Sequence, residues 1–269
     1  MIKKLGLSSE GSAFFSGHLW GAGLVFAGAF AFSTKAIFVK LAYQHAVDPV
    51  SLLAWRMLFS LPFFLAVAWF SHRSGAAGLQ RRDWFWIAGL GILGYYLASL
   101  LDFWGLQYIS ASLERLILYA YPSIVLIISY IWFKKPISRP QYWALGLTYL
   151  GIGLAFWGDW SAKEIDLVWQ GGLLVFGSAI FYALYLVGSG RMIPRVGSLR
   201  FNAYAMTSAS AGVILHAIFV NEAALFNLPG EVYRLSLGMA LLSTVAASFM
   251  LSAGVGRIGA GNASIISSV

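Results

Sequence analysis

The chain has 269 residues, of which 59% are hydrophobic and only 10% are charged. Soluble domains carry about 45–50% apolar and about 25% charged residues, so this composition excludes a soluble fold. The formal net charge is +8, but the basic residues fall between apolar runs and do not interleave with aromatic residues, so no nucleic-acid partner is expected. The sequence has no cysteine, which excludes disulfides and thiolate metal sites.

The apolar runs predict an all-α integral membrane protein, because a helix that crosses the bilayer needs about 20 apolar residues. Residues 1–17 are polar and carry no cleavable signal peptide, so we expect a cytoplasmic N-terminal segment. Predicted spans follow at 18–43, 50–70, 84–107, 110–133, 141–158, 169–190, 202–220 and 235–256, and a ninth begins at Gly259.

The distribution of Lys and Arg predicts the orientation, because cytoplasmic loops are enriched in these residues. With the N-terminus in the cytoplasm, only Lys163 and Arg234 lie in outer loops. The inner side then carries Lys3, Lys4, Arg73, Arg81, Arg82, Lys134, Lys135, Arg139, Arg191, Arg195, Arg200 and Arg257. We therefore expect a multi-pass protein of the bacterial inner membrane, surrounded by lipid.

An internal repeat divides the chain into residues 18–158 and 169–269. A shift of 149 residues pairs identical residues without a gap, among them Trp20/Trp169, Gly23/Gly172, Gly28/Gly177, Phe32/Phe181, Met57/Met206, Gly89/Gly238 and Gly105/Gly254. Five spans per half invert the second half relative to the first, an arrangement that is typical of secondary transporters. The prediction is an inverted repeat of 5+5 helices, of which the rest of span nine and all of span ten are missing.

Several segments resemble the EamA-like branch of the drug/metabolite transporter superfamily. They are "DPVSLLAWRM", "GLQYISASLERLILYAYPSIV", "KKPISRPQYWALGLTYLGIGL" and, in the second half, "GVGRIGAGNASIISSV". The resemblance implies a carrier of ten helices with a central cavity, which exports or exchanges metabolites such as amino acids.

Charged residues inside spans are costly and need a reason, which makes them candidate site residues. Six fall inside the predicted spans: Lys35, Lys40, Arg56, Asp102, Glu114 and Arg115. One hypothesis is that Lys35 and Arg56 hold a substrate carboxylate, while Asp102 or Glu114 takes an amine or a proton. The alternative is mutual pairing of helices, with Lys40 and Arg115 reaching the membrane interface.

Two further expectations concern the geometry of these residues. Glu114 and Arg115 point about 100° apart on a helix, so we expect one to face the cavity and the other a neighbouring helix. Arg56 and Glu114 lie at similar depth, which predicts that they share one polar network.

The second half is expected to contribute small and aromatic groups to the site, because its positions equivalent to Lys35, Arg56 and Asp102 are Leu184, Ala205 and Leu251. The candidates are Tyr182, Tyr185, Ser248 and Asn262.

The sequence favours a secondary carrier for a small zwitterionic or anionic metabolite, driven by the substrate gradient or by protons, in a monomer or a homodimer. A membrane-embedded enzyme and a lipid-binding scaffold remain alternatives. The four histidines are scattered without the spacing of metal ligands, and no Walker sequence occurs. We expect neither a metal nor a cofactor.

Overall fold

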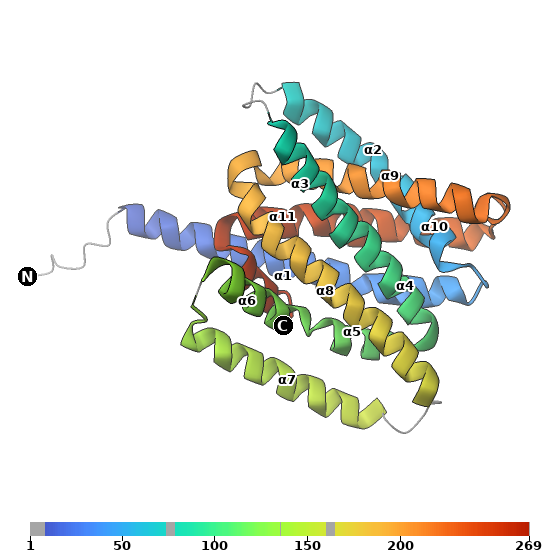
Figure 1. The fold of residues 1–269 in the computed structure, drawn as a ribbon, viewed down its shortest axis with the longest axis horizontal. Coiled ribbons are helices and arrows are strands. Elements are labelled where there is room, and N and C mark those ends of the chain that lie inside the picture. Colours follow the sequence, from blue (N-terminus) through green and yellow to red (C-terminus); the bar gives the residue numbers. More distant parts are fainter. Residues whose placement is uncertain (1–8, 74–78, 135, 160–164, 269) are drawn as a thin grey trace, which may run out of the picture.

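A computed structural model describes residues 9–73, 79–134, 136–159 and 165–268 as a bundle of helices, with no strand in these ranges (Figure 1). The first half contains α1 (Ser9–Tyr43), α2 (Pro49–Arg73), α3 (Arg81–Gly91), η1 (Ile92–Leu97), α4 (Ala98–Tyr108), α5 (Ala111–Leu118), α6 (Tyr121–Phe133) and α7 (Arg139–Asp159). The second half contains α8 (Ile165–Val196), α9 (Ser198–Leu225), α10 (Gly230–Gly238), η2 (Met239–Ala246), α11 (Ala247–Ile258) and α12 (Ala260–Ile266).

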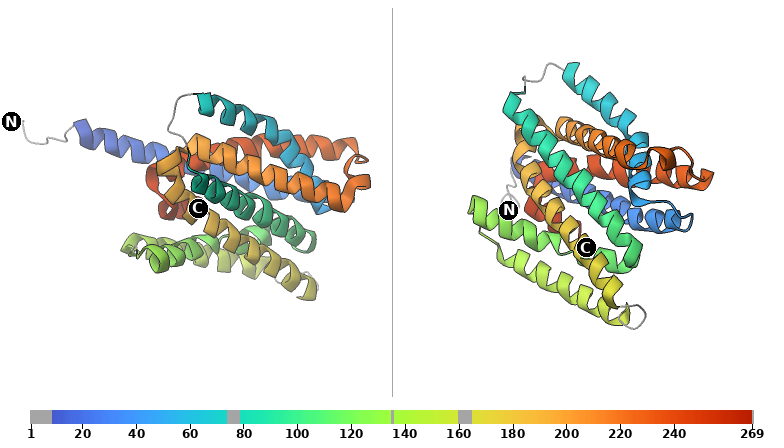
Figure 2. Two further views of the ribbon diagram at one scale, coloured as in Figure 1. Left: turned by 45° about the horizontal axis from the view of Figure 1, so that its top comes forward. Right: turned by 45° about the vertical axis from the view of Figure 1, so that its right-hand side comes forward.

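Within the described residues, seven helical segments are long and apolar enough to cross a membrane. They are Gly17–Tyr43, Pro49–Ser71, Arg81–Tyr108, Ala111–Phe133, Leu167–Val196, Ser198–Val220 and Gly230–Ile258. Each agrees with a predicted span to within a few residues at its ends, and α7 covers the predicted fifth span. Figure 2 shows α6 and α7 together along one edge of the bundle, with α7 outermost. The prediction of an all-α membrane protein is confirmed.

Three of these crossings are not uniform α-helices. Two contain a π-helical segment, η1 in Arg81–Tyr108 and η2 in Gly230–Ile258. The third breaks at Tyr119–Ala120, where Pro122 prevents the helix from continuing unbroken. The sequence analysis did not predict the π segments, although π turns are often found at functional sites.

The ends of the helices confirm the two repeats. Counterparts begin 149 residues apart, as in Pro49 of α2 and Ser198 of α9, or Arg81 of α3 and Gly230 of α10. The N-cap of α5 at Ser110 likewise matches the N-cap of α12 at Gly259. Figure 1 shows α8 running in the opposite direction to α1, and α9 in the opposite direction to α2. The halves are inverted, and each packs against the other: α1 lies on α11, and α8 lies on α4.

The ungapped offset of 149 residues is wrong for the first helix of each half. Gly21 of α1 lies so close to Arg257 and Ile258 that an added methyl group would touch them, and Gly171 of α8 lies in the same way against Tyr108 and Ile109. Likewise Gly254 faces Val25, whereas Gly105 faces Val175. The contacted residues, Tyr108/Arg257 and Ile109/Ile258, are counterparts with an offset of 149. The glycines that contact them, Gly21 and Gly171, are 150 residues apart, so the offset between α1 and α8 is 150.

The extra position lies in the connection between the first two helices of the repeat. In the first half the register changes between Tyr43 and Pro49. In the second half it changes between Ile193 and Ser198, and this segment is one residue shorter than its counterpart. As a consequence, the counterpart of Lys35 is Tyr185, and not Leu184 as the ungapped alignment predicted. The counterpart of Phe32 is Tyr182.

Candidate functional site

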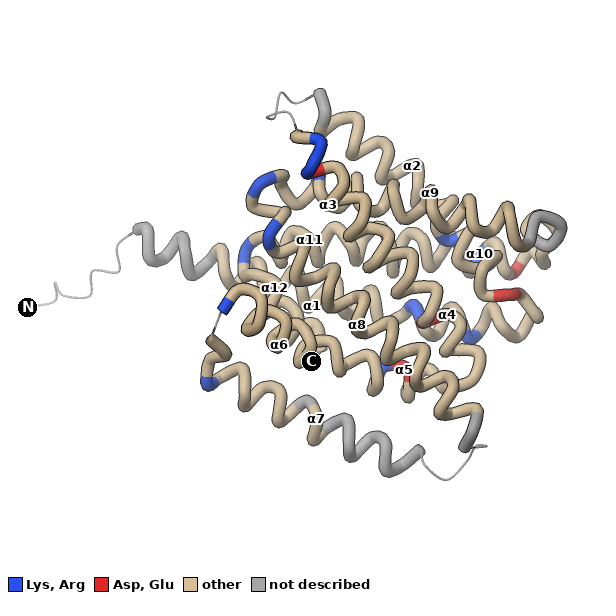
Figure 3. The backbone as a smooth tube through the Cα atoms, viewed as in Figure 1, with Lys and Arg blue, Asp and Glu red and all other residues tan. Residues whose placement is uncertain are grey.

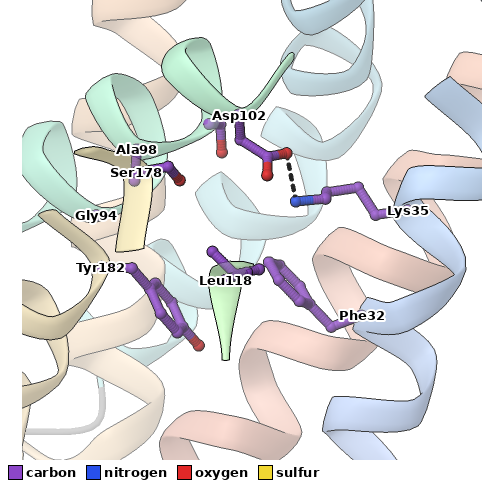
Figure 4. Close-up of a pocket in the computed structure, with 9 residues that line it drawn as sticks. Phe32, Lys35, Gly94, Ala98, Asp102, Leu118, Ser178 and Tyr182 are labelled. Atoms are coloured by element: carbon purple, nitrogen blue, oxygen red, sulfur yellow. Dashed lines mark hydrogen bonds and ion pairs between the residues drawn. The ribbon is translucent and has the colours of Figure 1, made fainter. Parts of the chain in front are cut away.

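A buried cluster of charges lies where α1 meets α4 and α5. The Lys35 ammonium donates to Asp102 Oδ2 at 2.6 Å and to Glu114 Oε1 at 3.4 Å (Figure 4 shows the first contact). These three side chains are at most 3% exposed. Figure 3 shows charged residues of both signs beside α4 and α5, inside the bundle. Since isolated charges are costly in this position, each sign stabilises the other.

The start of α5 holds Glu114 in place. Ser110 caps this helix by accepting a hydrogen bond from the Leu113 backbone N–H at 3.2 Å. Glu114 follows in the first turn, where the positive end of the helix dipole favours a carboxylate.

Arg115 contacts a neighbouring helix, as expected for one of the two residues, and it also joins the charge cluster. Its Nε lies 3.3 Å from Glu114 Oε2, and its Nη2 donates to the backbone carbonyls of Phe32 at 2.8 Å and Ser33 at 3.0 Å. The long side chain of Arg115 compensates for the 100° between the two positions, so both residues reach α1.

Arg56 does not join Glu114, so the prediction of a network between them is wrong. Its side chain is 1% exposed, donates to Ser99 Oγ at 3.3 Å and lies over the ring of Phe103, 5.3 Å from the ring centroid. Its Nε and Nη1 have no hydrogen-bond partner among the described residues. Equal depth in the membrane does not bring two residues together when they face different neighbours.

Lys40 has a structural contact as well. Its ammonium donates to the carbonyls of Leu106 at 2.9 Å and Ile109 at 3.1 Å, which end α4. These are carbonyls that a helix terminus leaves unsatisfied, and a cation there is also favoured by the helix dipole. The cap lies at the end of the crossing Arg81–Tyr108, and the extension of Lys40 to the membrane interface stays a prediction.

A small cavity lies beside the charge cluster. It is lined by residues of α1, η1, α4, α5 and α8, so both halves contribute: Phe32, Lys35, Gly94, Ala98, Ser99, Asp102, Leu118, Ser178 and Tyr182. Figure 4 shows Lys35, Asp102, Phe32 and Tyr182 around this space. It has room for about one water molecule and is too small for a metabolite. The cavity would therefore have to widen before it could hold a metabolite.

Tyrosines form the wall contributed by the second half. Tyr182 stacks on Phe32 with ring centroids 6.1 Å apart and meets the edge of Tyr121 at 5.1 Å. The Tyr185 hydroxyl donates to the Tyr95 hydroxyl at 3.0 Å.

The hydrogen bonds continue from Tyr95 into the second half. The Tyr95 hydroxyl donates to Asn202 Oδ1 at 3.5 Å, and Asn202 Nδ2 donates to Ser248 Oγ at 3.0 Å. Tyr185 and Ser248 thus lie in one polar chain near the cavity. Sequence reasoning missed Tyr95, Ser99 and Asn202, and the only signal for them was a polar group inside an apolar run.

The cavity and the charges beside it bring together several of the candidate residues from the sequence, namely Lys35, Arg56, Asp102, Glu114 and Tyr182. Asn262 is not among the lining residues. It is exposed near the start of α12, where its Nδ2 donates to Ile258 O at 3.1 Å and its Oδ1 accepts from Gln141 at 3.4 Å. In the described part of the chain, no group of three or more His, Asp or Glu side chains could hold a metal ion.

Comparison with known proteins agrees with this architecture. The chain is 32% identical over 245 residues to the "Uncharacterized transporter YcbK" of Bacillus subtilis (strain 168), covering 89% of this chain and 78% of that protein. It is 25% identical over 220 residues to the "Uncharacterized transporter YyaM" of the same organism, covering 81% of this chain and 72% of that protein.

One solved crystal structure has the same fold, with a TM-score of 0.68, covering 94% of this chain and 87% of the other. Its sequence identity of 18% supports the fold alone. The EamA-like transporter family matches residues 19–157 and 169–269, which are the two halves of the bundle. This chain, with its inverted repeats and buried polar centre, belongs to the EamA-like transporter family of the drug/metabolite transporter superfamily.

Proposed function

We propose that this protein is a secondary transporter that exports or exchanges small zwitterionic or anionic metabolites, such as amino acids, across the bacterial inner membrane. The observation that carries the proposal is the small cavity lined by both halves, with Lys35, Asp102 and Glu114 at its side. A buried ion pair often gives a protein no more stability than hydrophobic residues of similar volume. Charged residues at this position therefore indicate a role other than stability, such as binding a polar substrate.

Alternating access explains how a site of this kind transports. Inverted repeats allow the two halves to move against each other about a central site, which opens first to one side and then to the other. Because the cavity has room for only about one water molecule, such a movement would also have to widen it. Because residues of a single chain line it, a monomer is a sufficient transport unit, and a homodimer would contain two sites.

The charge cluster supports coupling to protons. Two carboxylates, Asp102 and Glu114, share the ammonium of Lys35, and Asp102 Oδ1 has no hydrogen-bond partner among the described residues. A proton or a substrate amine that binds a carboxylate competes directly with Lys35. Binding is thereby linked to the packing of α1 against α4 and α5 beside the cavity.

The orientation follows the basic residues. Lys and Arg gather at the end of the bundle where α9 starts and α6 ends, and we assign this end and the N-terminus to the cytoplasm (Figure 3).

Counterflow in proteoliposomes tests the function. Vesicles loaded with each of a panel of unlabelled amino acids and sugars are diluted into the same labelled compound, and we expect accumulation of at least one carboxylate-bearing compound. Asp102→Asn should abolish it, whereas Glu231→Gln should not, because Glu231 is exposed and pairs only with Arg234 at a helix start. No counterflow by the wild-type protein with any compound would contradict the proposal.

A second measurement addresses the protons. Glu114→Gln should retain counterflow but lose accumulation driven by a pH gradient if Glu114 carries the coupled proton. Equal accumulation by wild type and Glu114→Gln would exclude Glu114 from coupling.

A further inference from the structure

One buried cation lies outside the charge cluster. Lys35 and the partly exposed Arg115 share two carboxylates, Asp102 and Glu114. Lys35 and Arg115 are within 3.4 Å of these carboxylates, whereas Arg56 forms no ion pair among the described residues. A buried cation without a counter-ion is expensive, so the interior is complementary to one further negative charge.

Arg56 is placed to receive that charge. Ser99 accepts its hydrogen bond and also lines the cavity, so the guanidinium lies directly behind the cavity wall. Its Nε and Nη1 have no partner in the described part of the chain, although the residue is 1% exposed. A planar guanidinium binds a carboxylate through two parallel hydrogen bonds, which a lysine cannot provide.

We infer that Arg56, with Ser99, forms the subsite for a single carboxylate group of the substrate, and that Lys35 does not. This inference rests on the proposed transport function and names the group that the site selects. Lys35 is already engaged by two carboxylates, so a substrate carboxylate there would have to displace both. Arg56 has donors available without breaking any ion pair.

Ligand pairs that differ only in this group provide the test. The probes are the twenty amino acids and their carboxamides, and binding is measured by thermal shift on purified protein while transport is measured by counterflow. In the wild type, the acid should bind about tenfold or more tighter than its amide. Arg56→Lys should weaken binding of the acid by a similar factor and leave the amide unchanged, which removes the discrimination.

Three outcomes separate the possibilities. If Arg56→Lys keeps the preference for the acid, or weakens acid and amide equally, the subsite is wrong. If Arg56→Lys does not purify as a monodisperse protein, Ser99→Ala answers the same question, because it must also reduce the preference for the acid. If the wild type neither transports nor binds any probe, the transport function itself has failed, which is a different result from an intact transporter without acid preference.

A second inference comes from two aromatic contacts that join the halves. Trp84 and Tyr204 have ring centroids 4.6 Å apart, and Trp55 and Tyr233 have ring centroids 4.7 Å apart. With the offset of 149 residues, Tyr204 is the counterpart of Trp55 and Tyr233 is the counterpart of Trp84. The symmetry of the repeat therefore relates one contact to the other. Because the halves are inverted, the contacts lie at opposite ends of the bundle.

The helix starts identify these ends. Trp84 and Tyr204 lie near the starts of α3 and α9, and Trp55 and Tyr233 lie near the starts of α2 and α10 (Figure 1). Each contact links one half to the other, and the cavity lies between the two ends. Both contacts are made in this structure.

We propose that these two aromatic pairs are the gates of the cavity, and that transport opens one pair while the other stays closed. The Trp84/Tyr204 end carries an additional ion pair between Arg195 and Asp83 at 3.3 Å. The position that corresponds to Asp83 at the other end is Val232, so that end lacks a matching pair. The Trp55/Tyr233 end is held instead by a hydrogen bond from Trp55 Nε1 to the Leu225 carbonyl at 2.7 Å.

The absence of cysteine allows a direct test, because engineered pairs need no other change. Cysteines replace Trp84 and Tyr204 in one variant and Trp55 and Tyr233 in another, and a bifunctional maleimide or an oxidant links them. Each cross-link alone should stop counterflow, and reduction of the disulfide should restore it. The matched controls are the four single-cysteine variants treated with the same reagents.

Full counterflow with either pair cross-linked would overturn the proposal. If a double variant is inactive before cross-linking, labelling of the single variants Tyr204→Cys and Tyr233→Cys decides instead. A transported compound should change the labelling rate of both positions, and an unchanged rate at either position would refute its role as a gate.

Discussion

Phe32 and Tyr182 stack face to face, with ring centroids 6.1 Å apart and ring planes 10° apart, and they are counterparts in the two repeats. Two equivalent residues of an inverted repeat can touch only near the axis that relates the halves. The stack therefore marks the place where α1 and α8 meet, beside the cavity. Phe32 also lies 4.8 Å from the Lys35 ammonium and 5.5 Å from the Arg115 guanidinium, measured to its ring centroid.

Removal of this ring should damage both stability and transport. Phe32→Ala loses the stack and the face that both cations contact; because Phe32 is partly buried, the loss should stay below the about 3–5 kcal/mol that truncation of a fully buried Phe costs in soluble cores. Phe32→Tyr keeps the ring and should retain most activity. Phe219→Ala is the control, because Phe219 is 84% exposed within a crossing. Thermal unfolding followed by tryptophan fluorescence, together with counterflow, would show whether the two Phe→Ala changes differ.

The Lys35–Asp102 pair allows a test by double substitution. Lys35→Met leaves two buried carboxylates with one cation fewer, and a broken buried pair costs about 3–5 kcal/mol, so expression should fall sharply. Lys35→Met with Asp102→Asn removes both members and leaves Glu114 with Arg115. The double variant should recover expression without transport. Recovery of transport would mean that the pair is only structural, and expression as poor as in the single variant would contradict the pairing.

Orientation can be checked with a reporter that is active only in the cytoplasm. Fusions after Ser138 and after Gly197 should be active, because both sites lie at the end of the bundle that is rich in Lys and Arg. A fusion after Leu228, which precedes α10 at the opposite end, should be silent. The reverse pattern would overturn the assignment of the basic end to the cytoplasm.

The spans and the repeat could be predicted from the sequence because they depend on properties that run along the chain. Hydropathy and spacing locate Pro49 and Ser198 at the starts of matching helices without any knowledge of packing. Contacts across helices depend on the direction in which each residue points, which depth alone does not provide. Arg56 was therefore paired with Glu114, although Ser99 and Phe103 are its neighbours.

The single-residue change of register was missed for a similar reason. Identical pairs such as Trp20 and Trp169 favoured one ungapped offset, but Trp20 and Trp169 are both about two-thirds exposed and are not constrained by packing. Gly21 and Gly171 are constrained, since each lies against the other half of the bundle. Close contacts of small residues locate the repeat more reliably than matched exposed aromatics do.

The last prediction concerns the contact between α3 and α9 at Gly91. A methyl group at this position would overlap the backbone carbonyl of Ala205, which cannot move aside as a flexible side chain could. Gly89 lies two residues earlier on the same helix, and a methyl group there would meet nothing within 4 Å. The two glycines therefore form a matched pair for the same substitution.

Gly89→Ala should be neutral or stabilising, because alanine is favoured over glycine in a helix by about 1 kcal/mol. Gly91→Ala has the same intrinsic gain but must push α3 away from α9. We expect it to lower the midpoint of thermal unfolding and to reduce counterflow, because α3 carries Trp84 and leads into the π segment that lines the cavity. Equal unfolding midpoints for the two variants would show that α3 and α9 are not in close contact at Gly91.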